Sequence, residues 1–137
     1  FPQSKYLGPF AYTSDAYLEL LNIPEGLNIG VMLDAKTVLN SGLPVKQAVK
    51  CLFNERAKSI VSIVRVAAHV SEVPRCSAII AELVALGYET GLNVMQAGYR
   101  SDEELNQALG EFSAYQHLQV LYFADSFGNM DSAEVCR

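Results

Sequence analysis

The chain alternates short apolar runs with stretches of helical periodicity, and this alternation restricts its fold more than any other feature. The apolar runs are strand-sized and comprise residues 28–33, 60–68, 91–97 and 118–124. Apolar residues recur at helical spacing in residues 43–53, 72–86 and 101–112, and a further helix is expected at residues 15–21. Strands that alternate with helices in this way predict βα units and a parallel sheet, so the fold class is α/β.

Two architectures satisfy this pattern: part of a (β/α)8 barrel and an open, doubly wound sheet. The strands read as apolar on both faces, which is typical of a sheet covered by helices. A complete barrel typically takes about 250 residues, so 137 residues could hold only part of one. No linker or shift in composition divides the sequence. We therefore expect one α/β domain over residues 1–137, forming a piece of a larger barrel.

Composition excludes several classes of partner. The formal net charge is −5, whereas binding of nucleic acid needs clustered basic residues. No apolar run reaches the ~18 residues of a membrane span, and the first residues do not resemble a signal peptide. The three cysteines, Cys51, Cys76 and Cys136, are widely separated, which is typical of free thiols in a reducing compartment. We expect a cytoplasmic protein that binds neither nucleic acid nor membrane.

Polar residues lie at the carboxyl end of each apolar run. These residues are Asp34, His69, Gln96 and the pair Asp125-Ser126. The carboxyl ends of parallel strands meet at one edge of a sheet, where ligands bind in α/β proteins. The sequence therefore predicts a small-molecule site built from these side chains. Asp125 could instead cap a turn.

Arg65 is the charged residue in an otherwise apolar run. Alternation along a strand places it on the same face as His69. In one interpretation both line a polar barrel interior, with His69 at the rim, and Arg65 binds substrate. In the other, Arg65 pairs with a carboxylate and His69 caps a loop.

Several familiar catalytic signatures are absent from the sequence. No GxGxxG or GxxxxGK[ST] pattern is present, so neither a dinucleotide site nor a P-loop is indicated. A GxSxG elbow is missing as well. The two histidines are isolated, with no HxH or HExxH pair, so a metal site made wholly within this chain is not expected.

Four segments, in their order and spacing, resemble the DRE-TIM metallolyase (pyruvate carboxyltransferase-like or HMG-CoA lyase-like) superfamily. They are YLGPFAY (residues 6–12), VRVAAHVSE (64–72), LGYETGLNVMQAG (86–98) and VLYFADSFGNM (120–130). The resemblance is closest to the 4-hydroxy-2-oxovalerate aldolase branch. It implies a (β/α)8 barrel in which Mg²⁺ or Mn²⁺ assists cleavage or formation of C–C bonds in an α-keto acid or acyl-CoA substrate.

The same resemblance assigns the four apolar runs to barrel strands three to six. Asp34, His69, Gln96 and Ser126 would then end these strands, and Asp125-Ser126 resembles an Asp-Ser or Asp-Thr pair near the substrate. Two family motifs are missing: the Asp-Arg-Glu motif of strand one and the His-x-His pair of strand seven. The resemblance therefore implies a divalent metal in the parent enzyme, no metal ligands in this chain, and an inactive chain when it is isolated.

Two noncatalytic alternatives stay open at this point. The chain could be a flavodoxin-like module that acts through protein contacts. It could also bind a small anion at a helix N-terminus, at Ser101 or Ser132. A partial barrel would expose the edges of its first and last strands, so we expect a homo-oligomer.

Overall fold

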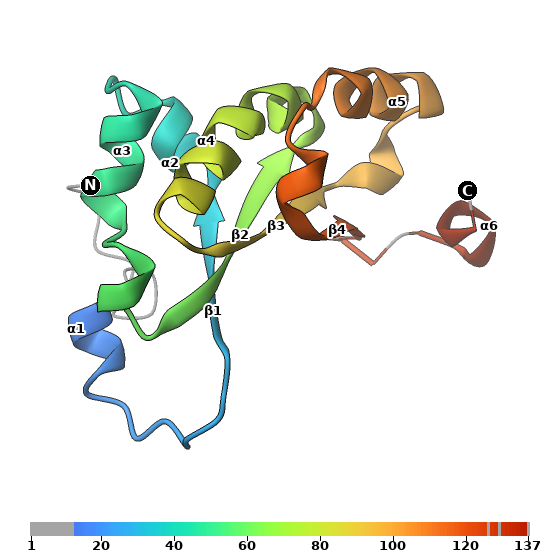
Figure 1. The fold of residues 1–137 in the computed structure, drawn as a ribbon. Coiled ribbons are helices and arrows are strands. Elements are labelled where there is room, and N and C mark those ends of the chain that lie inside the picture. The colour runs from blue at the N-terminus through green and yellow to red at the C-terminus, as the bar shows by residue number, and fades with distance from the viewer. Residues whose placement is uncertain (1–12, 126, 129, 137) are drawn as a thin grey trace.

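A computed structural model describes residues 13–125, 127–128 and 130–136 (Figure 1). Four parallel strands form one sheet, hydrogen-bonded in chain order. They are β1 (Ile29–Asp34), β2 (Val61–His69), β3 (Glu89–Met95) and β4 (Leu118–Ala124). The predicted α/β class and parallel sheet are confirmed, and the bounds of β4 are those predicted.

Helices connect the strands and flank the sheet. They are α1 (Asp15–Leu18), α2 (Ala35–Leu39), α3 (Val45–Leu52), α4 (Val73–Ala85), α5 (Asp102–Glu111) and α6 (Ser132–Val135). Single 3-10 turns lie at Arg56–Lys58, Val70–Glu72, Ala97–Tyr99 and Tyr115–His117. The sequence pattern did not predict α2, which begins directly after β1. Within the described part of the chain, no helix is long and apolar enough to cross a membrane.

Helices α2, α3, α4 and α5 lie on the same side of the sheet (Figure 1). A doubly wound sheet would carry helices on both faces and reverse its strand order, so the described residues do not form one. Consecutive strands with their helices on one side are instead the arrangement of successive βα units in a barrel. The expectation that both strand faces are apolar is wrong for β2, where Arg65 is exposed between buried Val64 and Val66.

The core lies between α4 and the middle of the sheet. Cys76, Ile79, Ile80 and Leu83 recur at helical spacing on α4, and all four are fully buried. They belong to one hydrophobic cluster with strand residues Val64, Val66, Leu92 and Val94. After the helix, Gly87 adopts a φ of +94° and donates its N–H to the carbonyl of Val84. This left-handed residue ends α4 as predicted and directs the chain into β3.

Replacing Leu83 by alanine tests the importance of this core. Leu83 is 0% exposed, whereas Leu20 is 82% exposed. We predict that Leu83→Ala lowers the free energy of unfolding by about 2–5 kcal/mol, because it removes buried methyl groups and leaves a cavity. Leu20→Ala is the matched control and should change it by less than about 0.5 kcal/mol. Urea unfolding measures both variants, and an equal loss of unfolding free energy in Leu83→Ala and Leu20→Ala would contradict this description of the core.

The cysteines should differ in reactivity. Burial raises the pKa of the Cys76 thiol to about 12, whereas Cys51 and Cys136 are exposed. Because the thiolate is the reactive form, we predict that iodoacetamide at pH 8 modifies Cys51 and Cys136 in the folded protein and spares Cys76. In urea all three should react. Mass spectrometry of peptides measures this, and rapid native modification of Cys76 would show that the α4 core is open.

Candidate functional site

The register of the sheet aligns residues of different strands on the face opposite the helices. Paired residues of neighbouring strands point to the same face of a sheet. Three rows across the strands define what we call the open face: Met32, Arg65, Gly91 and Val120; Asp34, Ala67, Asn93 and Tyr122; and His69, Met95 and Ala124.

The structure brings the predicted strand-tip residues to one edge of the sheet. Asp34 and His69 are the last residues of β1 and β2, and Gln96 and Asp125 directly follow β3 and β4. Ser126 lies outside the described residues. The shared carboxyl edge is thus present as expected. Binding of substrate by these residues stays a prediction.

Two of the acidic side chains at this edge accept hydrogen bonds from backbone N–H groups. Asp34 Oδ1 accepts a hydrogen bond from the Lys36 N–H at 2.9 Å and so caps α2. Asp125 Oδ2 accepts one from the Met130 N–H at 2.9 Å, and the Asp125 carbonyl accepts one from Gly128. Asp125 therefore caps a turn, which was the alternative interpretation. Both carboxylates fix the loops that surround the edge.

His69 and Glu72 organise the turn after β2. The His69 N–H donates to Glu72 Oε2 at 2.9 Å, and the imidazole is half-buried at the edge. Glu72 Oε1 lies 4.0 Å from Lys36 Nζ, so the same carboxylate links the segments that follow β1 and β2. The sequence analysis missed Lys36 and Glu72. The three-residue spacing of His69 and Glu72 is the available signal for the latter, because it is that of a capping box.

Gln96 has an unusual backbone at the end of β3. Its φ of 57° and ψ of 34° are left-handed, and no other described residue except glycine has a positive φ. This conformation costs an ordinary residue roughly 1–2 kcal/mol. Backbone strain of this kind is found at ligand-binding and active sites. The strained tip therefore supports Gln96 as a site residue.

Arg65 bonds across the sheet to Tyr122. Its Nη1 donates to the Tyr122 hydroxyl at 2.9 Å, and its guanidinium carbon lies 5.9 Å from the centre of the tyrosine ring. The alternative in which Arg65 pairs with a carboxylate is wrong for the described residues, where no acid lies within ion-pair distance of it. An exposed positive charge therefore stands on the open face.

Gly91 makes this cross-strand contact possible. It lies between Arg65 on β2 and Val120 on β4 in the register. A Cβ placed on Gly91 would lie 2.9 Å from Val120 Cγ1 and 3.6 Å from Arg65 Cγ. The missing side chain leaves room for the stem of Arg65 to cross β3 toward Tyr122.

Asn93 is the buried amide of the open face. It is 8% exposed and pairs with Ala67 and Tyr122 in the register. Its Oδ1 is buried and, among the described residues, has no hydrogen-bond partner. Neither Asn93 nor Tyr122 was singled out from the sequence. An amide two positions from the end of a buried strand was the available signal for Asn93.

The described residues do not assemble a metal centre of their own. Nowhere in the ranges described are three His, Cys, Asp or Glu side chains grouped so that they could hold an ion. A metal ion would therefore need ligands beyond this set.

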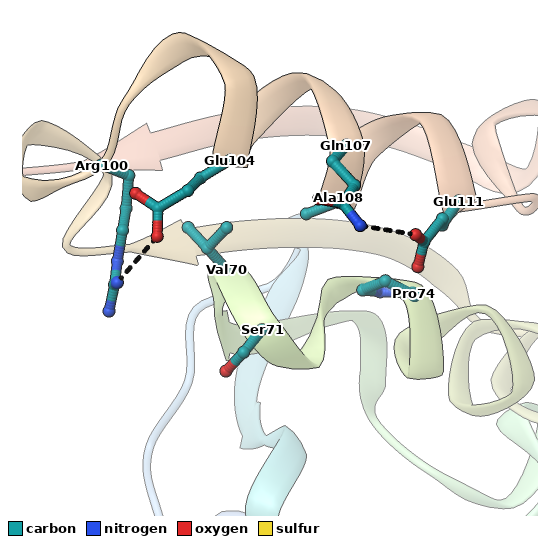
Figure 2. Close-up of a pocket in the computed structure, with 8 residues that line it drawn as sticks. All are labelled: Val70, Ser71, Pro74, Arg100, Glu104, Gln107, Ala108 and Glu111. Atoms are coloured by element: carbon teal, nitrogen blue, oxygen red, sulfur yellow. Dashed lines mark hydrogen bonds and ion pairs between the residues drawn. The ribbon is translucent and has the colours of Figure 1, made fainter.

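A hollow of about 260 Å³ lies away from the open face, between the start of α4 and the side of α5 (Figure 2). Two hydrogen bonds join polar side chains of its lining: Arg100 donates to Glu104 at 3.3 Å, and Gln107 donates to Glu111 at 3.2 Å. None of the predicted site residues lines it. The hollow is therefore separate from the candidate site.

The helix N-termini proposed as anion sites already have caps. Ser101 Oγ accepts from the Glu104 N–H, and Glu104 Oε2 accepts from the Ser101 N–H, as the predicted capping box requires. The first turn of α5 is also acidic. Ser132 is not a cap, because the Asp131 carboxylate occupies that position. These negative charges disfavour an anion at either helix start, and anion binding at the two serines stays a prediction.

Comparison with known proteins supports the fold. No family model matches the sequence, and no curated protein matches it either. A solved structure, the N-terminal domain of a putative aldolase from Bacteroides vulgatus, superposes with a TM-score of 0.71 at 24% identity. The match covers 99% of this chain and 43% of that chain. The likeness establishes the fold, and the chain spans less than half the length of that solved protein.

Replacing Gly91 by alanine tests how closely the side chains of the open face pack around this position. We predict that Gly91→Ala lowers the free energy of unfolding by about 1–3 kcal/mol, because the new Cβ overlaps the stiff Val120 side chain. Gly110 is the matched control: it lies in α5, and a Cβ there meets no atom within 4 Å. Gly110→Ala should stabilise the protein by up to about 1 kcal/mol. A Gly91→Ala variant as stable as the parent would contradict the close packing at this position.

Proposed function

We propose that this chain forms the site-bearing part of an aldolase-type enzyme that cleaves or forms C–C bonds of an α-keto acid or acyl-CoA. The observation that carries the proposal is the polar carboxyl edge, with His69 and Gln96 at adjacent strand ends. The edge belongs to a fold similar to that of the N-terminal domain of a putative aldolase. In α/β proteins this edge is where substrates react.

Aldol cleavage needs a proton carrier and a group that binds the substrate's carboxylate, and this chain has a candidate side chain for each. A proton leaves the hydroxyl group, the C–C bond breaks, and its electron pair forms an enolate that is then protonated. The His69 imidazole is the candidate proton carrier, because it lies at the edge and histidine is the side chain that most often transfers protons in catalysis. The exposed guanidinium of Arg65 supplies a positive charge on the open face, where a carboxylate could bind.

The proposal includes a divalent cation, Mg²⁺ or Mn²⁺, in the complete enzyme. Such an ion would stabilise the enolate as a Lewis acid. The described residues alone do not provide three suitable ligands. In this proposal the ligands come from outside the described residues, and the chain alone is expected to show no turnover.

The proposal also covers how the edges of the sheet are paired and in which cellular compartment the protein acts. The sheet has β1 and β4 at its two edges, and unpaired edges favour pairing with another element. Additional strands of a closed barrel, or a second copy in a homo-oligomer, would cover them. The widely separated thiols favour a role in the cytoplasm.

Substitution of His69 tests the proposed function. In the complete protein that contains this chain, assayed with Mn²⁺ for cleavage of a 4-hydroxy-2-oxo acid, His69→Gln should lower kcat about 10²–10⁴-fold through loss of proton transfer. His117→Gln is the matched control, because His117 precedes β4 at the opposite end of the sheet. It should retain full activity. Equal activity of both variants, or no aldolase activity in the parent protein, would contradict the proposal.

A further inference from the structure

Two exposed aromatic rings meet at the carboxyl edge of the sheet. Tyr99 lies in the turn after β3 and is 59% exposed, and Phe127 lies in the loop after β4 and is 63% exposed. Their ring centres are 5.6 Å apart, and the two ring planes cross at 80°. This edge-to-face geometry is a favourable arrangement for two aromatic side chains. Two large apolar groups are thus paired in solvent at the edge that carries His69 and Gln96.

Contacts between the two loops hold the rings in place. Asp125 Oδ2 accepts a hydrogen bond from the Met130 N–H and fixes the loop after β4. The Met130 side chain lies against Gly98, where a Cβ would be only 2.7 Å from Met130 Cγ. The methionine therefore occupies space that a side chain at Gly98 would fill. The turn with Tyr99 and the loop with Phe127 pack as one unit, so the rings form a preorganised apolar surface.

The position and size of this surface indicate a small ligand of the candidate site as its occupant. Gln96, whose left-handed backbone ends β3, comes three residues before Tyr99, and Asp125 comes two residues before Phe127. Both rings therefore lie on the segments that leave the strand ends of the site. Two aromatic side chains bury at most about 500 Å², whereas a stable protein interface takes about 800 Å² from each partner.

We propose that Tyr99 and Phe127 determine the specificity of the site by binding an aromatic or bulky apolar substituent of the substrate. The substituent is attached to the hydroxyl-bearing carbon of the bond that aldol cleavage breaks. An anionic substituent is disfavoured, because the Asp125 carboxylate lies in the same loop as Phe127. This inference rests on the proposed function, because it describes one part of the substrate of that reaction.

The spacing of the strands determines how large the substituent must be. Neighbouring strands lie about 4.8 Å apart, so roughly 10 Å separates the end of β2 from the end of β4. With the reacting carbon atoms at His69, at the end of β2, a methyl substituent stops short of the rings. A phenyl group extends toward them and can pack against a ring face or edge.

Two substrates that differ only in this substituent test the inference. The complete protein that contains this chain is assayed with Mn²⁺ on 4-hydroxy-2-oxo-4-phenylbutanoate, which gives pyruvate and benzaldehyde, and on 4-hydroxy-2-oxopentanoate, which gives pyruvate and acetaldehyde. We expect Tyr99→Ala and Phe127→Ala each to lower the ratio of the two kcat/KM values about five- to tenfold, because each removes one ring contact. The inherent reactivity of each substrate cancels when this ratio is compared between variants.

The aromatic pair of Phe112 and Tyr115 supplies the matched control. Its ring centres are 4.9 Å apart in the same edge-to-face geometry. Tyr115 is 43% exposed but lies in the turn before β4, at the opposite end of the sheet. Tyr115→Ala should therefore leave the ratio unchanged. Phe127→Tyr keeps the ring at the carboxyl edge and should keep the preference for the phenyl substrate.

Ligands that cannot be cleaved separate this inference from the proposed function. The keto acids 2-oxo-4-phenylbutanoate and 2-oxopentanoate lack the 4-hydroxyl group, so neither undergoes aldol cleavage. In calorimetry with Mn²⁺ present, we expect the phenyl ligand to bind at least tenfold more tightly and both alanine variants to reduce this advantage. Ring-dependent binding without turnover would support the inference and contradict the enzyme. Turnover with the same ratio in the parent, Tyr99→Ala and Phe127→Ala would support the enzyme and overturn the inference.

Sedimentation velocity tests the other occupant, which is a second protein molecule. Both rings are largely exposed, so the alanine variants should fold, with a Tm within about 3 °C of the parent. We expect them to sediment like the parent. If Tyr99→Ala and Phe127→Ala dissociate an oligomer and leave the ligand preference unchanged, the rings belong to a protein interface and the inference is overturned.

Discussion

The packing of α4 against β2 and β3 is the interaction on which the rest of the structure depends. It buries Ile79, Ile80 and Leu83 completely against one face of the sheet. Because side chains alternate along a strand, the same packing directs Arg65 and Asn93 to the opposite face. A slip of one residue would exchange the two faces. The apolar face therefore determines the positions of Arg65 and Asn93 on the open face.

Local patterns in the sequence predicted most of the elements. The strands are largely apolar runs. Both α4 and α5 show helical periodicity; a left-handed glycine follows α4, and a capping box begins α5. Such signals act within a few residues and can be read without tertiary contacts. The pattern failed at α2, because five residues are too few for periodicity to show. For the same reason Asp34 was interpreted only as a ligand residue, although its carboxylate caps that helix.

The candidate site could be predicted in its outline but not in its contacts. The positions of the strand ends in the sequence predicted the shared carboxyl edge, because the ends of parallel strands lie side by side. The bond between Arg65 and Tyr122 joins residues 57 positions apart and needs a bare glycine between them. It also needs the irregularity at Thr90/Gly91, where β4 contributes one extra residue and turns Tyr122 toward the open face. Neither condition is visible in the local sequence, so Tyr122 was missed.

The central claim is that one face of this sheet maintains the fold and the other binds a small polar ligand. A crystal structure of the complete protein with a bound 4-hydroxy-2-oxo acid tests it most directly. We predict density for the ligand on the open face, with its carboxylate at Arg65 and its reacting carbon atoms toward His69 at the carboxyl edge. A structure in which the ligand binds away from the open face, or does not bind at all, would contradict the claim.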